Sequence, residues 1–194
     1  MIRSADLIAF HDHGTGRPAG AVWDAIEANH RHNRLLWDEE DLARRRNVPD
    51  AEIAGNKRAI DRYNQARNDA IERIDEQLLQ ALEGVQRKPK ARLSSETPGM
   101  MIDRLSILAL KIHHMRLQAR RTDVDRAHVE ECSARVERLS EQRADLSACL
   151  DRLLAETQRG ESYFKVYRQF KMYNDPKLNP AIYGAAPTAE RPKR

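Results

Sequence analysis

The sequence has few aromatic residues and only two cysteines, Cys132 and Cys149. Because Phe, Trp and Tyr make up 5% of the 194 residues, the core must consist mainly of aliphatic side chains. If both cysteines lie on one helix, they are separated by about 25 Å, at 1.5 Å per residue, which is too far for a disulfide. Free thiols are typical of a reducing compartment, so we expect a cytoplasmic protein.

Long hydrophobic runs are absent as well. No run of about 18 apolar residues occurs, and the segment after Met1 lacks the apolar core of a signal peptide, so we expect no membrane span. The mean hydropathy is −0.78 and 33% of the residues are charged, which suits long helices with one exposed face. The length fits one domain, which we place at residues 1–183, followed by a disordered basic tail at 184–194.

Charge of one sign does not dominate the chain. The formal net charge is +4, and the last eight residues contribute +2 of it, which leaves about +2 for the rest. The basic runs at 44–46 and 87–92 each follow an expected helix, where cations interact favourably with the C-terminal end of the dipole. We therefore expect no nucleic-acid partner.

The prolines leave long segments with uninterrupted helical periodicity. We expect four long helices at about 21–46, 50–82, 98–121 and 124–159, and an aromatic helix over about 161–173. Residues 1–18 should form a short lead-in that is loop-like at 11–16. No alternating strand pattern is present. The sequence thus predicts an all-α fold, an antiparallel four-helix bundle with a short C-terminal aromatic helix packed across it.

The most apolar of these helices, 98–121, should be central, and its ionisable residues must then be paired or used. Asp103 and His114 are three helical turns apart and share one side, while Arg104 and Lys111 share an adjacent side. These charges could simply interact with the helix dipole. Alternatively, Arg104 and Lys111 hold a phosphate or carboxylate while Asp103 or His114 transfers protons. The N–H groups near Gly99 offer a further anion site.

The helix expected at 50–82 carries three asparagines beside its apolar seam, although asparagine costs about 0.6 kcal/mol relative to alanine in a helix. Asp61, Asn64 and Asn68 line one face, with Lys57 and Arg67 beside them. A solvated face with internal ion pairs such as Lys57–Asp61 is one interpretation. A polar pocket inside the bundle explains the asparagines better.

Metal chemistry is not predicted. Glu27–His30 and Asp125–His128 have the spacing found in di-iron bundles, but two further carboxylates on facing helices would be needed. Residues 11–13, His-Asp-His, are more typical of a surface turn than of a metal site. The sequence has no zinc spacing, P-loop, dinucleotide fingerprint or nucleophile elbow, and it identifies no cofactor.

Five distinct polar motifs lie along the chain: His30-x-x-Asn33-x-x-Leu36-Trp37, Asn64-x-x-Arg67-Asn68, Thr97-Pro98-Gly99, Asp103-Arg104-Leu105-Ser106 and Lys171-Met172-Tyr173-Asn174-Asp175-Pro176. Together they resemble a bacterial all-helical family known as a domain of unknown function. Members are often encoded near glycosyltransferases in lipopolysaccharide or other surface-polysaccharide clusters, which implies a surface-glycan pathway by association. The family pattern has an aromatic residue at His113 and often histidine at Asp38, so neither belongs to the predicted site.

Two functional hypotheses remain open. In the first, the protein binds an anionic sugar or nucleotide-sugar of surface-polysaccharide biosynthesis in a polar pocket, with or without catalysis. Its catalytic residues would be Asp103 and His114, and its ligand-binding residues His30, Asn33, Asp61, Asn64, Arg67, Asn68, Arg104, Lys111 and Tyr173. In the second, it is a non-catalytic helical adaptor that docks a glycosyltransferase. The polar seams also fit a homodimer interface with a specified register.

Overall fold

The structure is a computed structural model that describes residues 2–14, 17–170, 172 and 175–184, with only the backbone for Tyr183. Helices dominate it, so the all-α prediction is confirmed. Its elements are α1 (Ser4–His13), α2 (Ala21–Leu42), α3 (Asp50–Ala81), β1 (Arg92–Leu93), α4 (Pro98–Ala119), α5 (Arg126–Gln158), β2 (Ser162–Tyr163) and α6 (Pro180–Tyr183).

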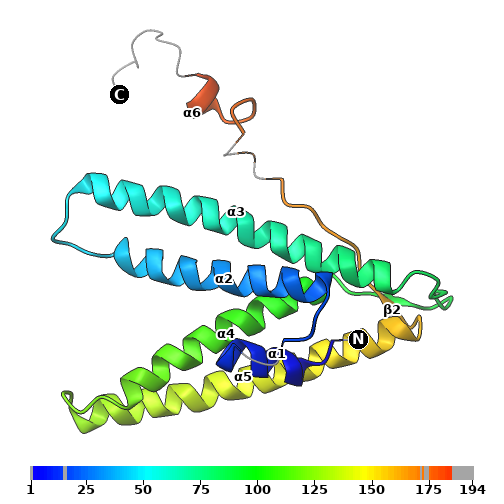
Figure 1. The fold of residues 1–194 in the computed structure, drawn as a ribbon, viewed down its shortest axis with the longest axis horizontal. Coiled ribbons are helices and arrows are strands. Elements are labelled where there is room, and N and C mark those ends of the chain that lie inside the picture. The colour runs from blue at the N-terminus through cyan, green and yellow to red at the C-terminus, as the bar shows by residue number, and fades with distance from the viewer. Residues whose placement is uncertain (1, 15–16, 171, 173–174, 185–194) are drawn as a thin grey trace, which may run out of the picture.

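The four long helices form two antiparallel hairpins, α2–α3 and α4–α5, which meet at one end and diverge toward the other (Figure 1). Each hairpin packs far more extensively within itself than against the other hairpin. The contacts between hairpins are made mainly by α4, which also touches α1, as expected for the central helix. An antiparallel four-helix bundle is not confirmed, because the helices pair in twos and the pairs splay apart.

The core lies where the two hairpins meet. Ile26 of α2, Ile74 of α3, Leu105 of α4 and Leu150 of α5 are completely buried and belong to one cluster. Each lies on the apolar stripe of its helix, so burial of these stripes stabilises the helices beyond their intrinsic propensity. The core is largely aliphatic, as the shortage of aromatic residues requires.

The N-terminal lead-in contains the helix α1, and the prediction that residues 11–16 are loop-like was wrong for residues 11–13, which end this helix. Leu7 and Phe10 of α1 are buried in the main core, and α1 contacts both α4 and α5. Asp151 of α5 accepts hydrogen bonds from the backbone N–H of Ser4 at 2.9 Å and from its hydroxyl at 2.6 Å. Packing and capping by residues distant in the sequence therefore stabilise a segment too short to show a clear helical pattern.

Arg143 is the one polar interruption that the sequence shows in the apolar seam of α5, and it fixes α1 in place. Its Nη1 donates to both carboxylate oxygens of Asp12, at 2.8 and 2.9 Å. The Arg143 side chain is 13% exposed, so this bidentate contact is a well-shielded one. It holds the last turn of α1, which carries His11, against the rest of the protein.

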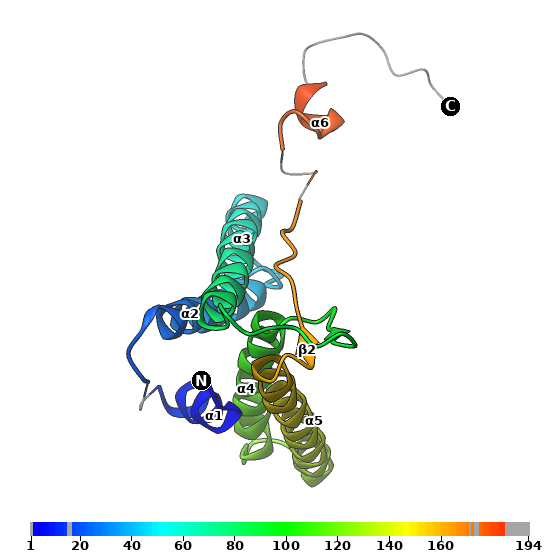
Figure 2. The same ribbon diagram turned by 90° about the vertical axis from the view of Figure 1, so that its right-hand side faces the viewer.

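The aromatic helix expected over 161–173 is not formed in the described part of that range. Ser162–Tyr163 pair in parallel with Arg92–Leu93, and residues 164–170 follow without regular structure, beside α3 (Figures 1 and 2). Arg168 pairs with Glu72 and Glu76 of α3. Phe164 is buried, but Phe170 is 89% exposed. The aromatic residues do not share one buried face, so nothing drives a helix here. The tail from residue 185 lies outside the described residues.

Cys132 and Cys149 both lie on α5 and are free thiols. In the described part of the chain, no helix is long and apolar enough to cross a bilayer. The helix ends also follow the predictions within a few residues, except that α2 stops at Leu42 rather than near residue 46.

Candidate functional site

The N-terminus of α4 is occupied by a carboxylate of the protein itself. Asp75 of α3 is 2% exposed and accepts a hydrogen bond from the backbone N–H of Gly99 at 2.7 Å. The Thr97 side chain caps the same helix by accepting from the backbone N–H of Met100 at 3.3 Å. The anion site expected near Gly99 is therefore filled by Asp75, which docks α3 on α4.

Asp75 should make stability depend on pH. Burial raises its pKa to about 6, although Thr97 and the Gly99 N–H oppose the shift. Between the unfolded pKa of about 4 and this value, the folded state binds more protons, so the free energy of unfolding falls as pH rises. We expect Asp75→Asn to gain roughly 2–3 kcal/mol relative to wild type between pH 4 and pH 7. Urea unfolding of both proteins across this range measures the gain, and a pH-independent difference would contradict it.

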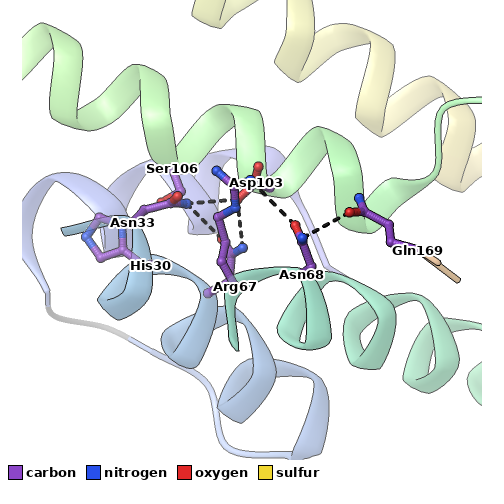
Figure 3. Close-up of polar contacts among 8 residues, drawn as sticks. His30, Asn33, Arg67, Asn68, Asp103, Ser106 and Gln169 are labelled. Atoms are coloured by element: carbon purple, nitrogen blue, oxygen red, sulfur yellow. Dashed lines mark hydrogen bonds and ion pairs between the residues drawn. The ribbon is translucent and has the colours of Figure 1, made fainter. Parts of the chain in front are cut away.

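A buried polar cluster joins α2, α3 and α4 where the hairpins meet (Figure 3). Asp103 Oδ1 accepts from Asn29 Nδ2 at 2.8 Å and from Asn33 Nδ2 at 2.9 Å. Arg67 Nε lies 3.9 Å from the same oxygen. Asp103 is 7% exposed, and two amide donors and a guanidinium compensate for the burial of its charge.

The cluster continues from Asn33 to His30 through Ser106. A carboxylate only accepts, so Asn33 must turn its amide nitrogen toward Asp103, and this nitrogen also lies 3.0 Å from Ser106 Oγ. Ser106 thus accepts from Asn33, and its own proton can be donated to His30 Nδ1, 2.9 Å away. Burial, together with Arg34, lowers the pKa of His30 to about 4. The ring is therefore neutral at pH 7 and shares one hydrogen bond with Ser106 through Nδ1.

Two cavities flank this cluster. The α3-side cavity, of about 410 Å³, lies between α2, α3 and α4, and its lining includes Asn33, Trp37, Asn64, Arg67 and Leu110. The α1-side cavity, of about 600 Å³, lies between α1, α2 and α4, and its lining includes His11, His30, Arg31, Arg34, Leu110 and Arg116. Asn33 lines one cavity, His30 lines the other, and Leu110 lines both, so the polar cluster lies at the wall between them.

Three residues that line the α3-side cavity have a buried polar atom without a hydrogen-bond partner. These atoms are Trp37 Nε1, Asn64 Oδ1 and Arg67 Nε. An unpaired buried polar atom costs about 1–3 kcal/mol. Trp37 Nε1 and Asn64 Oδ1 are unpaired and Arg67 Nε makes only the 3.9 Å ion-pair contact with Asp103, so this group around one cavity needs an explanation. The Trp37 ring is held in the cavity wall by His114, whose ring stacks on it at 4.3 Å between centroids.

The structure brings together about half of the residues predicted for the site. Asn68 belongs to the cluster by accepting from Arg67 at 3.5 Å and donating to Gln169 Oε1 at 3.0 Å (Figure 3). The predicted residues that lie in or beside the cluster are His30, Asn33, Asn64, Arg67, Asn68 and Asp103.

The remaining predicted residues lie elsewhere. Asp61 is exposed and pairs with Lys57, as expected if this face of α3 is solvated. Arg104 is also exposed, and it pairs with Glu96. Lys111 is exposed and lines other cavities. His114 lies about 16 Å from Asp103 along the axis of α4, so the two cannot act on one atom. Tyr173 lies outside the described residues.

Three residues of the site were missed by sequence reasoning. Asn29 precedes Asn33 by one helical turn, and a mid-helix asparagine pair is the same signal that was used for α3. Ser106 follows Asp103 by three residues on α4 and therefore shares its face. His11 gave no usable signal, because its segment was interpreted as a loop.

The two pairs of residues with di-iron spacing have structural roles. Asp125 caps α5 by accepting from the backbone N–H of His128 at 2.7 Å, and Glu27 forms an ion pair with Arg17 at 3.0 Å. Within the described ranges, no group of three or more His, Cys, Asp and Glu side chains is arranged to hold a metal ion.

A comparison with protein families places most of the chain in one of them. A family model described as "Protein of unknown function (DUF4254)" matches residues 23–166. The match covers nearly all of α2 and the whole of α3, α4 and α5, and thus the polar cluster and the α3-side cavity, but not α1. Comparisons with curated proteins and with solved structures found no match.

Proposed function

We propose that this chain, which belongs to the DUF4254 family of proteins of unknown function, binds an anionic sugar or nucleotide-sugar through the α3-side cavity. The observation that carries the proposal is the set of three buried polar atoms around that cavity that have no hydrogen-bond partner, of which only Arg67 Nε has an ion-pair contact. A role in surface-polysaccharide biosynthesis, which the family resemblance implies only by association, is part of the proposal.

Sugar hydroxyls match these atoms because each hydroxyl both donates and accepts hydrogen bonds. They can accept from Trp37 Nε1 and Arg67 Nε and donate to Asn64 Oδ1. The three atoms are covered in the unliganded arrangement, so binding requires small rotations of Asn64 and Arg67 toward the cavity. The size of the cavity, about 410 Å³, is in the range of small-molecule sites.

Asp103 holds two of the side chains that line this cavity. Asp103 fixes the Asn33 amide and attracts the Arg67 guanidinium, and both residues line the cavity. Asp103 is itself buried and does not line the cavity, and its Oδ1 accepts from two amides, so it acts as a positioning residue for its neighbours rather than as a group that meets the ligand. Side chains held in this way are characteristic of preorganised binding sites.

The proposal is tested by a thermal-shift measurement with glucose 1-phosphate and UDP-glucose, and related sugars, with and without Mg²⁺. A ligand at 100 times its dissociation constant should stabilise the protein by about 2.7 kcal/mol. Asn64→Leu removes the unpaired acceptor and should abolish the shift. Lys111→Ala is the matched control, because this exposed residue of α4 does not line the cavity. Equal loss in both variants, or no shift with any sugar ligand in a folded protein, would contradict the proposal.

The alternative function, a helical adaptor that docks a glycosyltransferase, is favoured by one observation. Large exposed hydrophobic residues of the described chain concentrate after residue 166: Tyr167, Phe170, Met172, Leu178 and Ile182. A partner protein would bury these side chains. If no sugar ligand stabilises the protein, the adaptor function is tested by measuring the binding of purified glycosyltransferases from the same organism to wild type and Phe170→Ser. It predicts tight binding that Phe170→Ser weakens.

A further inference from the structure

The α1-side cavity has an excess of positive charge. Arg31 and Arg34 of α2 and Arg116 of α4 line it, and none of the three has an ion-pair or hydrogen-bond partner within the described ranges. The guanidinium group stays protonated at any physiological pH. All three are exposed at the rim of the cavity, so water screens their mutual repulsion and their guanidinium groups are free to meet an anion that enters it.

The acidic residues of this cavity do not neutralise the three arginines. Asp12 and Glu27 line it, but each is bound by an arginine from outside the lining. Arg143 donates to both oxygens of Asp12, and Arg17 lies 3.0 Å from Glu27. Arg143 matches Asp12, whereas Arg17 is shared between Glu27 and Asp24. Five arginines therefore face three carboxylates here, and two positive charges remain without a partner.

Two stacked histidines add neutral hydrogen-bond donors to the same wall. The rings of His11 and His30 lie 4.8 Å apart between centroids. His11 is buried, and neither of its ring nitrogens has a hydrogen-bond partner. Burial, with His30 and Arg143 nearby, lowers the pKa of His11 to about 3, so this ring too is neutral at pH 7 and has one N–H to donate.

We propose that the α1-side cavity binds the phosphoryl groups of a phosphorylated ligand, with Arg31, Arg34 and Arg116 as charged donors. Guanidinium groups bind phosphate oxygens in a bidentate manner, and the volume of about 600 Å³ accommodates a diphosphate. The inference goes beyond the proposed function and does not rest on it, because the buried side chains of Asn33 and Ser106 separate the two cavities. The α3-side cavity is lined by Arg44 and Arg67 as well as Glu40 and Asp41, so it lacks the excess of positive charge found on the α1 side.

The test is isothermal titration calorimetry with pyrophosphate, which contains no sugar, at constant ionic strength. Wild type should bind pyrophosphate, and Arg34→Gln should weaken binding by about tenfold or more, as expected for the loss of a charge-assisted hydrogen bond. Arg62→Gln is the matched control. Arg62 is exposed on α3, so its replacement makes the same change in net charge at a position away from the cavity. It should leave the affinity unchanged within about twofold.

Two results would overturn the phosphoryl site. One is the absence of pyrophosphate binding to wild type. The other is an equal loss of affinity in Arg34→Gln and Arg62→Gln, which would show general attraction to a basic surface. Asn64→Leu separates this site from the proposed function, because it should leave pyrophosphate binding intact while it weakens sugar binding. If UDP-glucose binds in a manner that depends on Asn64 but pyrophosphate does not bind, the phosphoryl site is disproved and the sugar site stands.

Discussion

Replacing Asp103 by alanine is expected to lower the free energy of unfolding by about 3–5 kcal/mol, as for other buried ion pairs that lose one partner. The change removes the acceptor for Asn29 and Asn33 and leaves Arg67 beside a site without negative charge. Unpaired amide donors would then remain buried between α2 and α4, where water does not replace the lost contacts. Urea unfolding followed by circular dichroism measures the effect.

Asp61→Ala is the matched control, because Asp61 was predicted from the sequence to belong to the same site. Its side chain is 48% exposed and pairs with Lys57 one turn away on α3. Loss of such a surface pair costs about 0.3–0.5 kcal/mol. Asp103→Asn keeps the shape and one acceptor and should cost less than Asp103→Ala. If Asp61→Ala and Asp103→Ala had similar effects, burial of the Asp103 cluster would not be the cause.

The long helices could be predicted from the sequence because their periodicity is long and proline marks their boundaries. α2, α3, α4 and α5 each repeat an apolar stripe over many turns, so errors are confined to their ends. α1 could not be predicted in the same way, because it is short and depends on contacts with Asp151 and Arg143 of α5. The segment after Gly160 was misassigned for the opposite reason: its aromatic spacing resembles a helical face, but no other element covers that face.

The site was predicted in part, and the limit is set by how the hairpins cross. Residues three turns apart on α4 do share one side, as the spacing of Asp103 and His114 indicates. Both side chains meet α2, but at different points along it: Asp103 contacts Asn29 and Asn33, whereas His114 stacks on Trp37 farther along α2. The two hairpins also diverge along these helices (Figure 1). Periodicity reports which side a residue occupies, but residues on one side can still serve separate places along it. The mid-helix asparagines were the more reliable signal, because their cost requires a buried partner.

Gly99→Ala should have a second large effect, because α4 approaches α3 closely at this glycine. An added Cβ would lie 2.6 Å from the carbonyl oxygen of Ile71 and 2.9 Å from Oδ1 of Asp75. The first contact is with backbone, so α3 and α4 must move apart, which also lengthens the hydrogen bond from the Gly99 N–H to Asp75. We expect the free energy of unfolding to fall by about 2–3 kcal/mol, measured by urea unfolding.

Gly55→Ala on α3 makes the same chemical change where the added Cβ meets no atom within 4 Å. It should raise the free energy of unfolding by about 0.5–1 kcal/mol, because glycine loses more backbone entropy on folding than alanine does. Effects of the same sign at both positions would contradict the close approach at Gly99. Gly99 also lies one turn before Asp103, so its contact with α3 sets the depth at which Asp103 meets Asn29 and Asn33. The double variant Gly99→Ala/Asp103→Ala should therefore lose less than the sum of the two single losses.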